Sequence, residues 1–209
     1  MSEFSDDIYS EPADLDFDTL ANLGPLRRMA GVWQGTKGLD VKPKAEGPRS
    51  QAFVEHIELQ PIDPQTNGPQ VFYGLRYHTH IVKPDQVKTY HDQVGYWLWE
   101  PAAGVVIHTL AIPRGQIAMA VGQASADAES FEVVAERGAT TYGICSTPFL
   151  EYGFRTDSFR MTVTLGTDDS WSYFEDTVLM IRGREAPFHH TDRNTLTRVA
   201  APTPNPMAR

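Results

Sequence analysis

The sequence predicts an all-β protein: a single antiparallel up-and-down β-barrel of about ten strands with a short helical segment near its N-terminus. Two observations carry this prediction. Short segments rich in Val, Ile, Tyr, Phe, Trp and Thr follow one another after residue 31, and turn sequences such as KPDQ, PAAG, SADAES, GTDDS and DPQTNGP separate them. Strands in direct succession form a meander, and a long meander removes its exposed edges by closing. A two-sheet sandwich is the alternative arrangement.

The chain divides by composition into an arm, a body and a tail. The arm, residues 1–22, opens with eighteen residues that hold seven acidic and no basic side chains, and we expect it to be mobile or loosely docked. The barrel is expected over residues 23–200. The tail, residues 201–209, contains three prolines and cannot continue a strand.

The one helical pattern lies at the start of the body. Leu20, Leu23, Leu26 and Met29 recur at helical spacing, and the Gly24-Pro25 pair interrupts them. This predicts one or two short helical turns. Another stretch without clear strand character, TYGICSTPFLEYG, is expected to be irregular.

Composition and charge limit the classes of partner. The net charge is −9 and the sequence shows no cluster of Lys and Arg, so we expect neither nucleic acid nor an anionic membrane surface as a partner. The N-terminal sequence MSEFSDDIYS lacks the pattern of a secretory signal, and the single Cys145 excludes an internal disulfide. The expectation is a cytoplasmic protein with a small-molecule ligand, and a homodimer is compatible with it.

Histidines suggest one candidate metal site. His78 and His80 stand two residues apart in a predicted strand and therefore point to one face, which is a two-ligand geometry. His91 leads the next strand and shares a face with Gln93, Trp97 and others. A non-haem metal-dependent enzyme using His78, His80 and His91 is thus one hypothesis. The alternative is that the first two histidines lie on the outer, solvated face.

Four short motifs, in order along the chain, resemble the nitrobindins, a family of haem-binding β-barrels. GVWQGTKG, at residues 31–38, resembles their first strand; HDQVGYW, at 91–97, and AIPRG, at 111–115, resemble two further segments; and PFHHTDRNTLTRV, at 187–199, resembles their last strand. Lys37, Gln93 and Arg114 replace a glycine, a glutamate and a threonine of the family pattern.

The resemblance implies a barrel shaped like the fatty-acid-binding proteins and lipocalins, with ferric haem b as the cavity ligand, held by a histidine of the last strand. Members are linked to nitric oxide binding and peroxynitrite isomerisation, so an enzymatic activity stays open. The candidate cofactor-binding residues that follow are His91 on the distal side, Arg114 and Trp33.

The resemblance also indicates which position of the last segment corresponds to the iron ligand of the family. Counted from Pro187, the family's ligating histidine falls on Thr191, and His189 and His190 are therefore the candidate iron ligands in this chain. In a regular strand His189 points to the same side as Thr191 but lies about 6.6 Å away along the strand, whereas His190 points to the opposite side.

Neither face of this last segment is apolar. Whichever face lines the cavity must be hydrogen-bonded to a partly polar ligand or to water. A barrel that binds another partly apolar small molecule, or an interaction module with a vestigial pocket, stays open beside haem.

Overall fold

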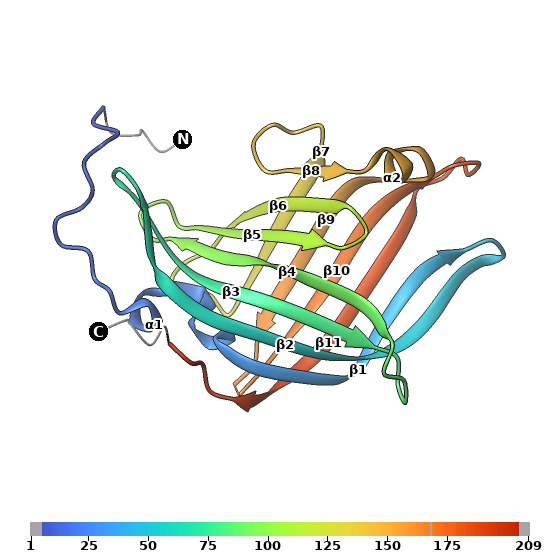
Figure 1. Cartoon of the computed structure of the whole chain (residues 1–209), viewed down its shortest axis with the longest axis horizontal. Helices are drawn as coiled ribbons and strands as arrows, with labels where there is room; N and C mark the ends of the chain where they lie inside the picture. Colours follow the sequence, from blue (N-terminus) through green and yellow to red (C-terminus); the bar gives the residue numbers. More distant parts are fainter. Residues whose placement is uncertain (1–5, 168, 205–209) are drawn as a thin grey trace.

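Eleven β-strands in the described part of the chain, residues 6–167 and 169–204, close into one barrel in this computed structural model (Figure 1). Strands that follow one another in sequence lie side by side except at β8, since β9 pairs with β7, and β1 pairs with β11 to close the sheet. The prediction of a barrel rather than a sandwich is confirmed. The strands are β1 (Gly31–Lys44), β2 (Gly47–Asn67), β3 (Gln70–Val82), β4 (Thr89–Glu100), β5 (Val105–Ile112), β6 (Gln116–Gln123), β7 (Ser130–Arg137), β8 (Gly143–Ser146), β9 (Phe154–Leu165), β10 (Ser170–Ile181) and β11 (Phe188–Ala200).

One pairing departs from the predicted antiparallel order. β6 and β7 pair at Val121 and Val134, and the short β8 then lies between them, antiparallel to β6 and parallel to β7. Because β8 pairs with residues 116–118 of β6 and 136–137 of β7, it supplies hydrogen-bonding partners where these two strands diverge. The barrel is therefore mixed rather than purely antiparallel.

Several element boundaries differ from the sequence prediction. The stretch expected to be irregular contains β8 and the six-residue helix α2 (Pro148–Gly153). The DPQTN sequence, expected to be a turn, continues β2 to Asn67, because a register shift between Ile62 and Gln65 absorbs Pro64 into the long strand. β11 begins at Phe188, so both histidines of the last segment lie in the sheet.

The N-terminal helical turns close one end of the barrel. They are α1 (Thr19–Asn22) and the 3-10 helix η1 (Gly24–Met29), and Leu23, Leu26 and Met29 are fully buried. The indole Nε1 of Trp33 donates to the carbonyl of Met29 at 2.7 Å, and its ring meets Trp171 edge-on with centroids 6.2 Å apart. The predicted helical spacing is thus confirmed as the apolar plug of this end.

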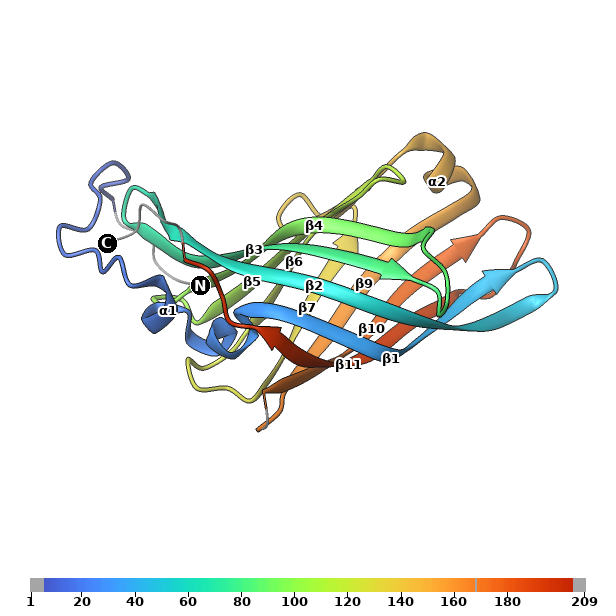
Figure 2. The same cartoon turned by 60° about the horizontal axis from the view of Figure 1, so that its bottom comes forward.

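The opposite end of the barrel is open. Figures 1 and 2 place the β1–β2 hairpin, the β3–β4 and β10–β11 connections and α2 together at this end, away from α1. Residues 6–22 of the arm run past the plugged end, where the Thr19 hydroxyl donates to the carbonyl of Ile62 and the Tyr73 hydroxyl to that of Asp16; residues 1–5 lie outside the described part of the chain. No helix in the described residues is long and apolar enough to cross a membrane.

Candidate functional site

A cavity of about 450 Å³ lies inside the barrel between the plug and the open end. Its size is typical of small-molecule sites. Its inner part is aromatic and apolar, with Trp97, Phe159, Met161 and Trp171 in the wall. Its outer part is polar and is lined by side chains of β1, β2, β10 and β11, among them Asp40, Glu55, Glu175, His190 and Asp192. The cavity therefore suits a ligand with an apolar body and at least one polar group.

His190 lies at the centre of the polar wall. Its Nε2 is 2.9 Å from Oδ1 of Asp40 and 3.5 Å from Oδ2 of Asp192. The antiparallel register of β1 and β11 sets Asp40 opposite Asp192 and so brings these groups together. The second oxygen of Asp40 accepts from the Tyr90 hydroxyl, and Lys42 Nζ lies 3.6 Å from it. One imidazole is thus held by two carboxylates, with a lysine beside the nearer one.

Within this cluster, His190 and Asp40 each favour the charged form of the other. Burial acts to lower the pKa of His190, but the hydrogen bond to Asp40 and the charge of Asp192 outweigh it, so the pKa is raised. Burial likewise acts to raise the pKa of Asp40, and the hydrogen bonds from His190 and Tyr90 hold it below its usual range. Around neutral pH we therefore expect Asp40 to be ionised and His190 to carry positive charge more readily than a free histidine.

Two further carboxyls lie deeper in the wall. Oε2 of Glu55 accepts from the Tyr173 hydroxyl at 3.0 Å and from Nδ2 of Asn194 at 2.9 Å. Burial raises the pKa of Glu55 to about 7 although these donors act in the other direction. Burial also raises the pKa of Glu175, and the neighbouring Asp192 adds to the shift. Near neutral pH these carboxyls can therefore be protonated and can donate hydrogen bonds into the cavity.

A hydrogen-bonded chain runs along the wall from the open part toward the aromatic interior. His91 Nε2 lies 3.2 Å from Oε1 of Gln93, the Gln93 amide donates to the Tyr77 hydroxyl at 2.7 Å, and that hydroxyl lies 2.9 Å from Nε2 of His108. Burial lowers the pKa of His91, and the nearby Arg114 and His190 lower it further. His91 is thus a neutral wall residue, fixed by its partner on the same strand.

His108 is a wall residue that the sequence analysis did not single out. Its ring is buried and stacks on Trp97, with centroids 3.9 Å apart and planes inclined by only 6°. Burial lowers its pKa to about 3, so the ring is neutral, and its Nδ1 has no partner among the described residues. The residues around His108 in β5 are mostly apolar, so the sequence gives no local sign of a binding residue there. Only the inward direction of the side chain identifies His108 as part of the cavity wall.

The structure distributes the six predicted cofactor-binding residues over three places. His91, Arg114 and His190 line the cavity, with Arg114 exposed at the open end, where it donates to the carbonyl of Tyr90. Trp33 lies in the plug. His189 and Thr191 lie on the outer face of β11, where His189 Nδ1 bonds the carboxylate of Asp176.

The orientation expected for the last segment is therefore corrected. The family pattern predicts a cavity-facing side chain at Thr191, yet β11 turns the other face inward. Its buried or cavity-lining residues alternate, and they are Phe188, His190, Asp192, Asn194 and Leu196. The pairing with β10 continues without a bulge from Phe188 to Thr197, so nothing rotates Thr191 into the barrel.

The histidines of the metal-enzyme hypothesis do not meet. His78 bonds Asp92 and His80 bonds the Thr89 hydroxyl, both at 3.0 Å on the outer side of the sheet. His91 lies on the opposite, inward face of β4. Since the sheet separates His91 from the other two, these three residues cannot share an ion.

One group in the described residues does have the spacing of metal ligands. One side-chain ligand atom from each of Asp40, His190 and Asp192 lies within 4.8 Å of the others. This set shares no residue with His78, His80 and His91, and all three of its members line the cavity.

A closed barrel around a cavity with one buried polar wall defines a small-ligand-binding β-barrel. A family model described as the THAP4-like, heme-binding beta-barrel domain matches residues 22–198, and the chain belongs to this family. The nitrobindin-like resemblance is thereby confirmed. The crystal structure of Rv2717c from M. tuberculosis is similar in fold, with a TM-score of 0.59 and 21% identity over 88% of this chain and 99% of that chain. No curated protein matches the chain.

Proposed function

We propose that the barrel binds one partly apolar small molecule in its cavity, and that ferric haem is this molecule. The observation that carries the proposal is His190, a histidine on the cavity wall with one ring nitrogen bonded to the carboxylate of Asp40. Metal-ligating histidines characteristically give one ring nitrogen to a carboxylate or carbonyl and use the other for the metal. Among the described residues, none makes a hydrogen bond to the other nitrogen of His190, Nδ1.

The remaining wall residues fit the same ligand. Trp97, Phe159 and Met161 provide apolar surface for a flat macrocycle. Lys42 and Arg114 stand toward the open end and provide cations for the two carboxylates that haem carries. His190 would hold the iron, Asp40 would orient His190, and His91 would remain on the wall as a neutral hydrogen-bonding residue. When bound, haem would supply an iron centre that binds small diatomic molecules.

A matched pair of variants tests this proposal. Purified protein titrated with ferric haem should develop a Soret band characteristic of histidine ligation, and His189→Ala should leave the band unchanged because that side chain lies outside the barrel. His190→Ala should remove the histidine-ligated band. A wild-type protein that never develops the band, or an equal band in both variants, would reject His190 as the ligand of haem.

A second candidate follows from the spacing of Asp40, His190 and Asp192. These groups could hold a divalent cation in place of haem. Asp40 is already bonded to Tyr90 and lies beside Lys42, which argues against a further cation there. Asp192→Asn separates the two readings. It should weaken binding of Zn²⁺ or Mn²⁺ measured by calorimetry, and it should leave haem binding by His190 in place.

A further inference from the structure

The net charge of −9 is unevenly distributed over the barrel. We use the term rim for the segments around the open end. The rim consists of residues 42–49, 83–88, 113–115, 147–157 and 182–187. It holds nine Lys and Arg against five Asp and Glu, a net charge of +4, whereas the rest of the chain, with nine against 22, carries −13. The expectation that no anionic membrane surface is a partner rests on the net charge of the whole chain and on the lack of a Lys and Arg cluster in the sequence. The rim cations form no such cluster because they come from five separate segments.

Hydrogen bonds join the rim segments to one another. Thr147 N donates to the carbonyl of Gly115 at 2.9 Å, and Arg182 N donates to that of Gly153 at 3.1 Å. The Arg184 guanidinium donates to the carbonyl of Lys44. These bonds link α2, the β5–β6 turn, the β10–β11 connection and the β1–β2 hairpin to one another. Figures 1 and 2 show these segments at the same end of the barrel, opposite α1.

Most rim cations lack a carboxylate partner. Lys42 is beside Asp40, and Arg155 is paired with Asp157. Among the described residues, no ion pair involves the following six rim cations: Lys44, Arg49, Lys83, Lys88, Arg182 and Arg184. A cluster of four to eight such cations is the size that attracts anionic lipid headgroups.

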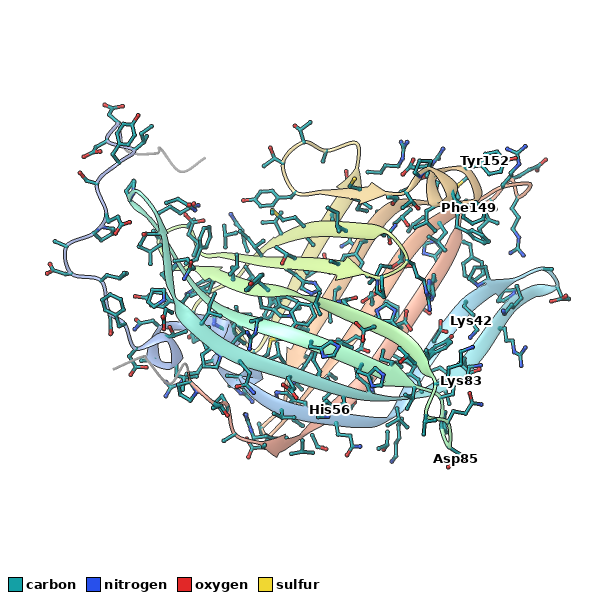
Figure 3. The ribbon with its side chains drawn as sticks, viewed as in Figure 1. Lys42, His56, Lys83, Asp85, Phe149 and Tyr152 are labelled. Atoms are coloured by element: carbon teal, nitrogen blue, oxygen red, sulfur yellow. The ribbon has the colours of Figure 1, made fainter. Side chains whose placement is uncertain are left out.

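Large apolar side chains project from the same rim. Val87 is 98% exposed, Phe149 67%, Tyr152 60% and Phe154 41%. Figure 3 shows Phe149 and Tyr152 projecting from α2 at the end of the barrel that also carries Lys42 and Lys83. The Arg182 guanidinium lies 4.0 Å from the centre of the Tyr152 ring, so cation and aromatic ring are presented together.

We propose that the rim docks on an anionic lipid surface, with the cavity opening toward the lipid. The cations would meet the headgroups, and Val87, Phe149 and Tyr152 would enter the interfacial region. The apolar tips come from separate connections and form no groove. A fluid lipid surface can accommodate several separate apolar side chains at once, whereas a folded acidic protein would need a surface of complementary shape. This proposal holds whichever ligand the cavity binds.

The acidic remainder of the protein does not prevent such docking. A strand of twelve residues such as β10 is roughly 40 Å long at about 3.3 Å per residue. The Debye length at physiological ionic strength is only about 8 Å, so charges toward the plugged end are screened from a surface at the rim. They would instead favour the orientation that points the plug away from the lipid.

Co-sedimentation of the full chain with vesicles tests the proposal. Protein should sediment with vesicles of equal parts phosphatidylcholine and phosphatidylglycerol, should not sediment with phosphatidylcholine alone, and should be released by about 0.5 M NaCl. Lys83→Glu with Lys88→Glu should lower the partition coefficient roughly tenfold or more. Arg27→Glu with Arg28→Glu makes the same change of charge at the plugged end and should have little effect.

The apolar tips have their own matched control. Phe149→Ser should weaken binding several-fold, whereas Phe174→Ser, at a residue 47% exposed on the outer wall, should not. Thermal midpoints equal to that of the wild type exclude misfolding of the variants. If the variant with Lys83→Glu and Lys88→Glu does not fold, Arg49→Glu with Arg182→Glu takes its place. No sedimentation with anionic vesicles, equal loss in the plugged-end variant, or tight binding of soluble polyglutamate without vesicle binding would overturn the proposal. The last result would indicate an acidic protein partner.

Discussion

At the plugged end of the barrel, apolar groups pack against one another, whereas toward the open end carboxyls, histidines and a lysine are held inside the same sheet. Trp33, Leu26 and Met29 are fully buried at the plug. Toward the opening, Glu55 and Glu175 are enclosed with only partial compensation, and their raised pKa values record the cost of burying a charge. We infer that the plug provides stability and that the open half sacrifices part of it for a polar binding wall.

Trp33→Ala tests the first half of this comparison and should have the largest effect. The ring is fully buried, bonds Met29 and packs on Trp171, so its removal leaves a cavity. We expect a loss of about 3–5 kcal/mol in the free energy of unfolding, measured by denaturant melts. A loss below about 1 kcal/mol would show that the plug contributes little stability.

Glu55→Gln tests the second half through pH. Burial raises the pKa of Glu55 from 4.5 to about 7, so the folded protein retains a proton that the unfolded chain releases. The stability that this group contributes is complete below about pH 4.5 and is lost as the pH rises through 7, by on the order of 3 kcal/mol. The variant should flatten the decline of stability between pH 5 and about 8 in thermal melts. An unchanged decline would mean that Glu55 is ionised in the folded state.

Tyr77→Phe tests how much the hydrogen-bonded chain of the wall contributes. The hydroxyl has Gln93, His108 and the carbonyl of Thr109 as neighbours within hydrogen-bond distance, and its loss leaves buried polar groups without a partner. A destabilisation of about 1–3 kcal/mol is expected in denaturant melts. A neutral result would indicate that water replaces the hydroxyl in the cavity.

Thr191→Val should have the smallest effect. The side chain lies on the outer face of β11, and valine is as favourable in a strand as threonine. The free energy of unfolding should change by less than about 0.5 kcal/mol, and haem titration should be unaffected. If this substitution instead alters haem binding, the inward face of β11 differs from the one described, and the assignment of His190 fails with it.

Much of the fold could be predicted because local pattern and tertiary structure agree. On β4 the alternation of His91, Gln93 and Trp97 with Val94 and Tyr96 marks an aromatic face, and that face is the inward one. The apolar spacing from Leu20 to Met29 likewise predicts the plug. The candidate site was only partly predictable: His91, Arg114 and His190 were named, but Asp40, Glu55, His108 and Glu175 were not, because isolated acids and histidines in strands carry no local signal.

The sequence by itself determined the succession of strands, the closure of the barrel and the apolar plug, since each rests on the spacing of apolar residues along a short segment. Only the tertiary structure decided which face of residues 188–200 turns inward. Both faces of that segment are polar, so hydrophobicity could not choose between His190 and Thr191, and the register with β1 and β10 made the choice. The tertiary structure alone also decided the positive charge of the rim. The cations come from five separate segments of the sequence, and closure of the barrel brings these segments to one end.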